Sequence, residues 1–167
     1  MEIAKNDEEV NQVRKEAIKK LKDQKLVVDI AKNTKDWVVR EAAVKKLEDQ
    51  ELLTEIAKND KQREVRKAAM ENNNLVDQTV LAEIAKNDEY NYIRETAVGK
   101  LDSEKWQELL AEIAKNDKHW EVRKAAAENN NLVDQTLLAE IAKNDEYNYV
   151  REAAKKRLKE LKILKKK

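Results

Sequence analysis

The sequence predicts an all-α fold, an α-solenoid in which six short helix pairs stack side by side. Three observations predict it. The phrase Ile-Ala-Lys-Asn, followed by a Val-Arg or Ile-Arg pair, occurs six times, and repetition at this spacing indicates units that stack on their neighbours. The 167 residues contain no Pro and one Gly, whereas helix formers are abundant. Each copy also carries two apolar patterns of helical spacing.

The repeat length is measured from the arginines of the Val/Ile-Arg pairs, which stand 26, 26, 28, 29 and 28 positions apart. They are Arg14, Arg40, Arg66, Arg94, Arg123 and Arg151. The longer intervals arise around 71–74, 102–108 and 128–131, and such insertions belong in connections. We expect a single domain, with units at about 1–22, 23–48, 49–76, 77–101, 102–133 and 134–167.

Within each unit, a first and a second helix are expected. The first, for example 52–57, has apolar residues at i, i+1, i+4 and i+5, which lie on one helical face. The second, for example 39–47, has an apolar stripe with Ala at its centre, which suggests that two backbones approach closely there. These alanines are Ala17, Ala43, Ala69, Ala97, Ala126 and Ala154.

Polar residues mark the expected helix ends. First helices have aspartate caps at Asp23, Asp49, Asp77 and Asp134. Asp36 can cap a second helix in the same way, and Asn73–Asn74 and Asn130–Asn131 are predicted to adopt the left-handed turn that ends a helix. Gly99 aligns with the middle of a second helix, where it costs up to roughly 1 kcal/mol relative to Ala. Two explanations for a glycine at this position are a close contact with a neighbouring segment and neutral sequence change at an exposed position.

Composition argues against several chemistries. Thirty-five basic and 34 acidic residues leave a net charge of +1, so no global field attracts nucleic acid or membranes. Cysteine is absent and His119 is the only histidine, so we expect no disulfide, no metal site and no cofactor. No nucleophile–base constellation is visible, which favours a non-enzymatic protein. The sequence begins without a signal-peptide pattern, and we expect a cytoplasmic protein.

The pattern Asn-Asp, a short turn, Val-Arg-x-Ala-Ala-x-x-x-Leu and then Leu-Leu-x-x-Ile-Ala resembles the bacterial HEAT-like repeats over essentially the whole chain. Segments 68–75 and 80–85 are also similar to leucine-rich variant repeats. The resemblance implies that second helices line a concave, ligand-facing surface, and that the Asp and Arg columns hydrogen-bond along the stack. The matching aspartates are Asp7, Asp60, Asp88, Asp117 and Asp145, whereas Thr34 departs from the pattern.

The six arginines have two interpretations, a phosphate-binding stripe or a structural ladder. Each lies in one repeat column beside an Asp column, which favours the ladder. The next column alternates in sign without exception, whereas a nucleic-acid groove would keep one sign. It reads Lys15, Glu41, Lys67, Glu95, Lys124 and Glu152.

Two segments, 66–95 and 123–152, are nearly identical and differ only at three apolar positions. This fits recent duplication of a two-unit block, and it fits an engineered or consensus-derived array. At the ends of the chain, the first unit lacks the usual leucine pair and is truncated. The last helix is long and ends in three lysines, which indicates either a polar cap with a dipole complement or a basic contact surface.

Aromatic residues gather at the start of second helices, at Trp37, Tyr90, Tyr92, Trp120, Tyr147 and Tyr149. They either pack between units or form a rim that binds a protein, since Trp and Tyr are favoured binding anchors. Trp106 lies in the longest connection and either covers it or is a separate binding residue.

The leading functional hypothesis is a non-catalytic scaffold that binds a protein or peptide through the second helices. The candidate contact residues are Trp37, Lys45, Lys46, Glu71, Asn72, Tyr92, Lys100, Trp120, Glu128, Asn129 and Tyr149. A second hypothesis is a structural or artificial array without a natural ligand, either a monomer or weakly self-associating through its truncated N-terminal end. A third, disfavoured by the alternating charges, is a DNA-binding protein of the HEAT-like glycosylase type. We expect neither nucleic acid nor membrane as a partner.

Overall fold

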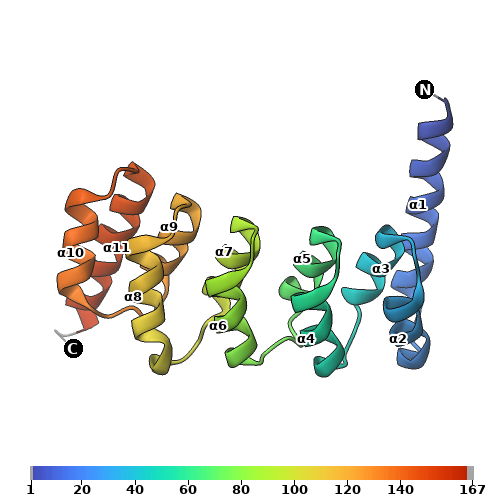
Figure 1. The fold of residues 1–167 in the computed structure, drawn as a ribbon, viewed down its shortest axis with the longest axis horizontal. Helices are drawn as coiled ribbons and strands as arrows, with labels where there is room; N and C mark the ends of the chain where they lie inside the picture. The colour runs from blue at the N-terminus through green and yellow to red at the C-terminus, as the bar shows by residue number, and fades with distance from the viewer. Residues whose placement is uncertain (1, 165–167) are drawn as a thin grey trace. The chain divides into compact units, whose positions relative to one another are not determined.

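The computed structural model describes the backbone of residues 2–164 and the side chains of residues 9–162. Over this range it contains eleven α-helices and one short 3-10 helix, and no strand (Figure 1). The all-α prediction is therefore confirmed. The chain divides into two compact halves, 1–77 and 78–167, and each is described by itself.

The N-terminal half contains five helices. They are α1 (Glu2–Lys20), α2 (Gln24–Asn33), α3 (Trp37–Val44), α4 (Gln50–Asn59) and α5 (Arg63–Glu71). Helix α2 packs on α3 and α4 packs on α5, while α3 also contacts both α1 and α5. The second helices of neighbouring pairs are therefore in direct contact in this half.

The C-terminal half repeats this arrangement. Its elements are α6 (Gln78–Asn87), α7 (Asn91–Lys100), η1 (Glu104–Trp106), α8 (Gln107–Asn116), α9 (Trp120–Glu128), α10 (Gln135–Asn144) and α11 (Asn148–Leu164). Helix α6 packs on α7, α8 packs on α9, and α10 packs on α11. Helix α9 also contacts both α7 and α11. The eight to ten residues of most of these helices are too few to persist alone in water, so this packing stabilises them.

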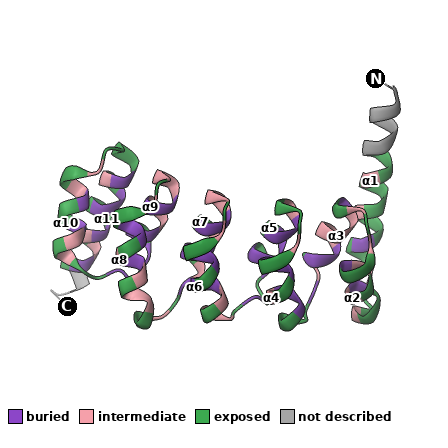
Figure 2. Cartoon of the chain, viewed as in Figure 1, coloured by how far each residue is buried: buried purple, intermediate pink, exposed green. Residues whose placement is uncertain are grey.

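Buried side chains follow the two apolar stripes of each pair (Figure 2). The first helices bury residues such as Leu53 and Leu110, and five of the six column alanines are fully buried on the second helices. Their small size lets neighbouring helices approach closely. Ala17 on α1 is the exception and is exposed, and α1 packs mainly on α3.

Helix α1 differs from the predicted first unit. The repeat pattern indicated a short helix, a turn at Asn6–Asp7 and a second helix, but the backbone is one continuous helix from Glu2 to Lys20. The leucine pair that packs each first helix against its partner is missing here, so nothing favours a turn over continuation of the helix. This expectation was wrong.

The helix caps agree with the prediction at several ends. Asp23, Asp49 and Asp134 accept hydrogen bonds from the first-turn amides of α2, α4 and α10, and Asp36 does the same for α3. The left-handed turns at the asparagine segments were predicted wrongly, since no described residue has positive φ. Side-chain hydrogen bonds hold these turns instead.

Candidate binding surface

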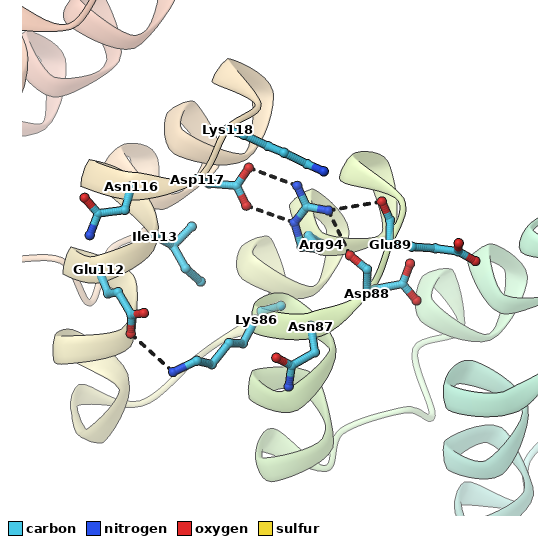
Figure 3. A pocket seen from close by; sticks show the side chains of 11 residues that line it. Lys86, Asn87, Asp88, Glu89, Arg94, Glu112, Ile113, Asn116, Asp117 and Lys118 are labelled. Carbon is cyan, nitrogen blue, oxygen red and sulfur yellow. Dashed lines mark hydrogen bonds and ion pairs between the residues drawn. The ribbon is translucent and has the colours of Figure 1, made fainter.

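The start of each second helix carries an arginine, and several of these arginines join neighbouring helix pairs. In the C-terminal half, Arg94 of α7 donates from Nε and Nη2 to both carboxylate oxygens of Asp117, at 2.9 Å each (Figure 3). Its Nη1 donates to the carbonyl of Asp88 at 2.8 Å, six residues earlier in the same pair. One guanidinium therefore holds its own turn closed and binds the turn of the next pair, the bidentate geometry that Arg favours.

The same arrangement recurs at two further arginines. Arg40 binds both oxygens of Asp60 at 3.2 and 3.1 Å, and Arg123 binds those of Asp145 at 2.8 and 3.1 Å. Arg66 donates to the carbonyl of Asp60 at 2.9 Å. The side chains of Arg94, Arg123 and their aspartates are about nine-tenths buried or more, so these pairs lie inside the protein.

At either end of the chain the pattern changes. Arg14 binds Asp36 at 2.9 Å, so Asp36 replaces the aspartate missing at Thr34 and caps α3 with its other oxygen. Arg151 of α11 donates to the carbonyls of Asp145 and Glu146 at 2.7 and 3.0 Å. Each arginine of the column thus makes a hydrogen bond within the protein, and Arg14, Arg40, Arg94 and Arg123 bond to an aspartate of the next helix pair.

Each ladder aspartate also accepts a bond from its own turn. Asp88, Asp117 and Asp145 receive the amide two residues later at 2.8–2.9 Å. Burial raises the pKa of Asp117 and Asp145, but the arginine and the backbone amide outweigh burial, and the pKa of each is lowered. Both carboxylates are therefore held in the charged form.

A second set of connectors lies at the opposite ends of the second helices. Asn129, after α9, donates from Nδ2 to the carbonyls of Val98 and Leu101 at 2.8 and 3.0 Å, which are the last carbonyls of the preceding second helix and its turn. Asn72 does the same for Val44 and Leu47 at 2.8 and 2.9 Å. A helix C-terminus otherwise leaves such carbonyls without partners.

These contacts correct the assignment of Asn72 and Asn129 as exposed partner-binding residues. Both are buried, and each Oδ1 also accepts the amide two residues later at 2.8 Å. The sequence signal was present but overlooked, because one column of the repeat contains only hydrogen-bond donors. It reads Lys46, Asn72, Lys100, Asn129 and Arg157.

Two cationic members of this column make the same kind of bond. Lys46 donates to the carbonyls of Lys19 and Leu21 at 2.6 and 2.5 Å, at the end of α1. Arg157, nearly fully buried on α11, donates to the carbonyls of Leu132 and Asn130. Lys46 is therefore half-buried rather than a free surface residue, and Lys100 is half-buried with its pKa lowered by burial.

Hollows lie beside two of the arginine–aspartate pairs. The one at Arg94–Asp117 has a volume of about 440 Å³, and the one at Arg40–Asp60 about 590 Å³. Figure 3 shows the first, where Lys86 and Glu112 form an ion pair at 3.5 Å along one side. The polar groups at the floor of both hollows already bind one another, so these hollows present paired charges to a ligand.

The column whose charge alternates in sign lies on the second helices, and its members form ion pairs both between helices and within one helix. Lys15 and Glu41 approach to 3.9 Å between α1 and α3, whereas Lys124 pairs with Glu128 at 2.8 Å within α9. Glu95 on α7 is exposed, and burial and then the nearby charge of Glu121 raise its pKa. The negative charges of Glu95 and Glu121 therefore oppose each other across α7 and α9, and the charge of Lys124 offsets part of this effect.

The aromatic residues form a cluster in the C-terminal half. The ring of Trp120 stacks on Tyr149 at 5.1 Å and on Tyr147 at 6.0 Å, centroid to centroid, across the contact of α9 and α11. The guanidinium of Arg123 lies 5.5 Å from the Tyr147 ring. Tyr149 is 64% exposed and Tyr147 is 41% exposed, so the cluster joins two helices and presents ring surface to solvent.

The remaining candidate residues are distributed along the same helices. Trp37 at the start of α3 is 38% exposed, and Lys45, Glu71 and Glu128 near helix ends are exposed. Tyr92 on α7 is half-buried and its ring lies 5.9 Å from that of Tyr90. The C-terminal candidates therefore lie on the three neighbouring helices α7, α9 and α11.

A scan against protein-family models found no match, and searches of curated proteins and of solved structures found none either. Among the described residues, no group of His, Asp and Glu is arranged to hold a metal ion. None of the described helices is long and apolar enough to cross a membrane.

Proposed function

We propose that this chain is a non-catalytic scaffold of HEAT-like repeats that binds a protein or peptide through its second helices. The observation that carries the proposal is the Trp120–Tyr147–Tyr149 cluster, hereafter the aromatic cluster. Large rings that stay exposed although they stack on one another offer apolar contact area at little entropic cost, which is the property of binding anchors. The repeat pattern and its resemblance to bacterial HEAT-like repeats support an α-solenoid as the scaffold.

The connectors support a binding role in a different way. Because the arginine and asparagine columns are used within the protein, the residues left to contact a partner are those that vary between copies. At the position of Tyr149 the other second helices carry Val38, Glu64, Tyr92 and Glu121. Variation on a fixed framework is how repeat scaffolds acquire specificity.

The test is a pull-down from lysate with the purified full chain and mass spectrometry of what it retains. We compare the wild type with a double variant, Trp120→Ala with Tyr149→Ala, and with Val133→Ala as a control. Val133 is exposed in the same half but lies outside the aromatic cluster. Proteins retained by wild type and control but lost by the double variant support the proposal. If none is lost, binding through the aromatic cluster is refuted.

A second candidate function is self-association through α1. Val10 and Val13 are 40% and 69% exposed and lie one turn apart, with the exposed Ala17 one turn further on. This apolar stripe is able to pack against a second copy. Light scattering over a range of protein concentrations tests it, because the mass should rise with concentration in the wild type and stay monomeric in Val13→Glu.

A further inference from the structure

Glu121 stands apart from the other carboxylates on the second helices. It lies in the first turn of α9, next to Trp120 in the sequence, and the residue is half-buried. Its Oε2 is out of contact with water and accepts no hydrogen bond from any described residue. A buried carboxylate oxygen without a donor is costly, which makes this oxygen an acceptor that a partner can satisfy.

The residues around Glu121 are suited to a cation. The repeat places Tyr92 of α7 and Tyr149 of α11 in the same column as Glu121 of α9, and α9 contacts both helices. The carboxylate therefore lies on the middle helix of three, with an aromatic ring in register on each side. Aromatic faces attract cations, and Arg stacks on them better than Lys because its guanidinium is planar.

The electrostatics around Glu121 agree with this. The charge of Glu121 contributes to the raised pKa of Glu95 on α7, so the two carboxylates feel each other's field. The nearby Lys124 forms an ion pair with Glu128 at 2.8 Å. A cation supplied by a partner would lower the repulsion between Glu95 and Glu121 and gain a charge-assisted hydrogen bond.

The N-terminal half contains an internal comparison. Glu64 of α5 occupies the same column as Glu121, and there the preceding residue, Arg63, donates from Nε to the carboxylate at 2.8 Å. In α9 the position of Arg63 is taken by Trp120. The chain thus supplies a guanidinium to one carboxylate of this column, and puts an aromatic ring in its place beside the other.

We infer that the face formed by Tyr92, Glu121 and Tyr149 binds an arginine side chain of a partner peptide. This rests on the proposed function and specifies the chemistry of what is bound. The guanidinium stacks on the exposed ring of Tyr149 and donates to the carboxylate of Glu121. Because Oε2 is shielded from solvent, the side chains that cover it must shift to admit the guanidinium. Tyr149 is the most exposed aromatic of the described residues and so offers its ring to a partner.

The test is an NMR titration of the ¹⁵N-labelled full chain with the peptide acetyl-Gly-Ser-Arg-Ser-Gly-amide, up to about 10 mM because one side chain binds weakly. We expect saturable shifts of the Trp120 indole N–H and of the amides of Glu121 and Tyr149. The matched peptide with citrulline, which keeps the shape but lacks the charge, should leave these signals in place. Equal shifts with citrulline or lysine peptides, or none with the arginine peptide, overturn the inference.

Two matched variants locate the contact. Glu121→Gln should weaken the arginine peptide about tenfold, because a charged hydrogen bond is lost. Glu64→Gln, the same change where the chain supplies its own arginine, should leave the affinity unchanged. Circular dichroism establishes that both variants are folded. If Glu121→Gln binds like wild type, or if Glu64→Gln weakens binding equally, the inference is overturned.

The outcomes separate this inference from the proposed function. If a retained protein is lost from the Trp120→Ala, Tyr149→Ala variant but still binds Glu121→Gln, the proposed scaffold function is supported and the arginine contact is overturned. If no protein depends on the aromatic cluster, the proposed function itself fails.

Discussion

The arginine–aspartate pair on the first helix of the chain has very different surroundings from a pair inside the C-terminal half. Arg14 and Asp36 in the N-terminal half are 53% and 31% exposed, whereas Arg123 and Asp145 in the C-terminal half are 7% and 8% exposed. Helix α9, which carries Arg123, is covered by α7 and α11, whereas α1 packs mainly on α3. We therefore expect burial by flanking helices to decide how much an arginine–aspartate pair contributes to stability.

Removing one partner of the buried pair tests this difference most strongly. Arg123→Ala leaves the Asp145 carboxylate buried without its bidentate donor and should lower the free energy of unfolding by about 3–5 kcal/mol. Arg14→Ala removes an exposed pair and should cost about 0–1 kcal/mol. Urea denaturation followed by circular dichroism measures both. Equal losses would contradict the role assigned to burial.

The asparagine connectors extend the comparison to the other ends of the helices. Asn129→Ala removes a buried donor from the carbonyls of Val98 and Leu101 and should cost about 2 kcal/mol of unfolding free energy. Asn73→Ala, at an exposed turn position, is the control and should change stability by less than about 0.5 kcal/mol. If Asn129→Ala leaves the unfolding free energy unchanged, water replaces the side-chain hydrogen bonds of Asn129 without cost.

The buried pairs should also respond to acid. Because the pKa of Asp117 and Asp145 is lowered in the folded protein, their contribution is complete above the unfolded carboxyl pKa of about 4 and is lost as pH falls through the lower folded values. The effect is smaller than deletion, since a protonated carboxyl keeps some hydrogen bonding. In the double variant Asp117→Asn with Asp145→Asn, the free energy of unfolding should fall less steeply between about pH 5 and about pH 2, because these two carboxylates no longer take up protons. If the slope of unfolding free energy against pH is the same in the wild type and the double variant, Asp117 and Asp145 do not contribute to the acid sensitivity.

The smallest effect is expected where no connector is involved. Gly99 on α7 is exposed, has no positive φ, and a Cβ placed there would meet no atom within 4 Å. The close-contact explanation for this glycine is therefore excluded. Gly99→Ala should raise the unfolding free energy by about 0.5 kcal/mol through helix propensity. Thermal unfolding measures this change in stability. If Gly99→Ala instead lowers the stability, the expectation that a Cβ is accommodated at this position is contradicted.

Several parts of the candidate surface were predictable from the sequence because the repeat aligns them. The arginine column, its aspartates and the alanine column fall at fixed positions, and the aromatic residues gather a few positions before the arginine. The asparagine connectors were not predicted, because Asn72 and Asn129 at a helix end also fit an exposed surface that binds a partner. What distinguishes the two is a carbonyl of the preceding helix, about 25 residues away in the sequence, as with Asn72 and Leu47.

The sequence by itself determined the helices, their approximate limits and the columns that face the core, since these follow from local propensity and apolar spacing. Only the tertiary structure decided how deeply each column is buried, that α1 is one helix, and that Glu121 keeps an oxygen without a donor. Burial and hydrogen-bond satisfaction depend on which helices lie on each side of a residue. Identical residues in a repeat therefore acquire different roles from their neighbours in space.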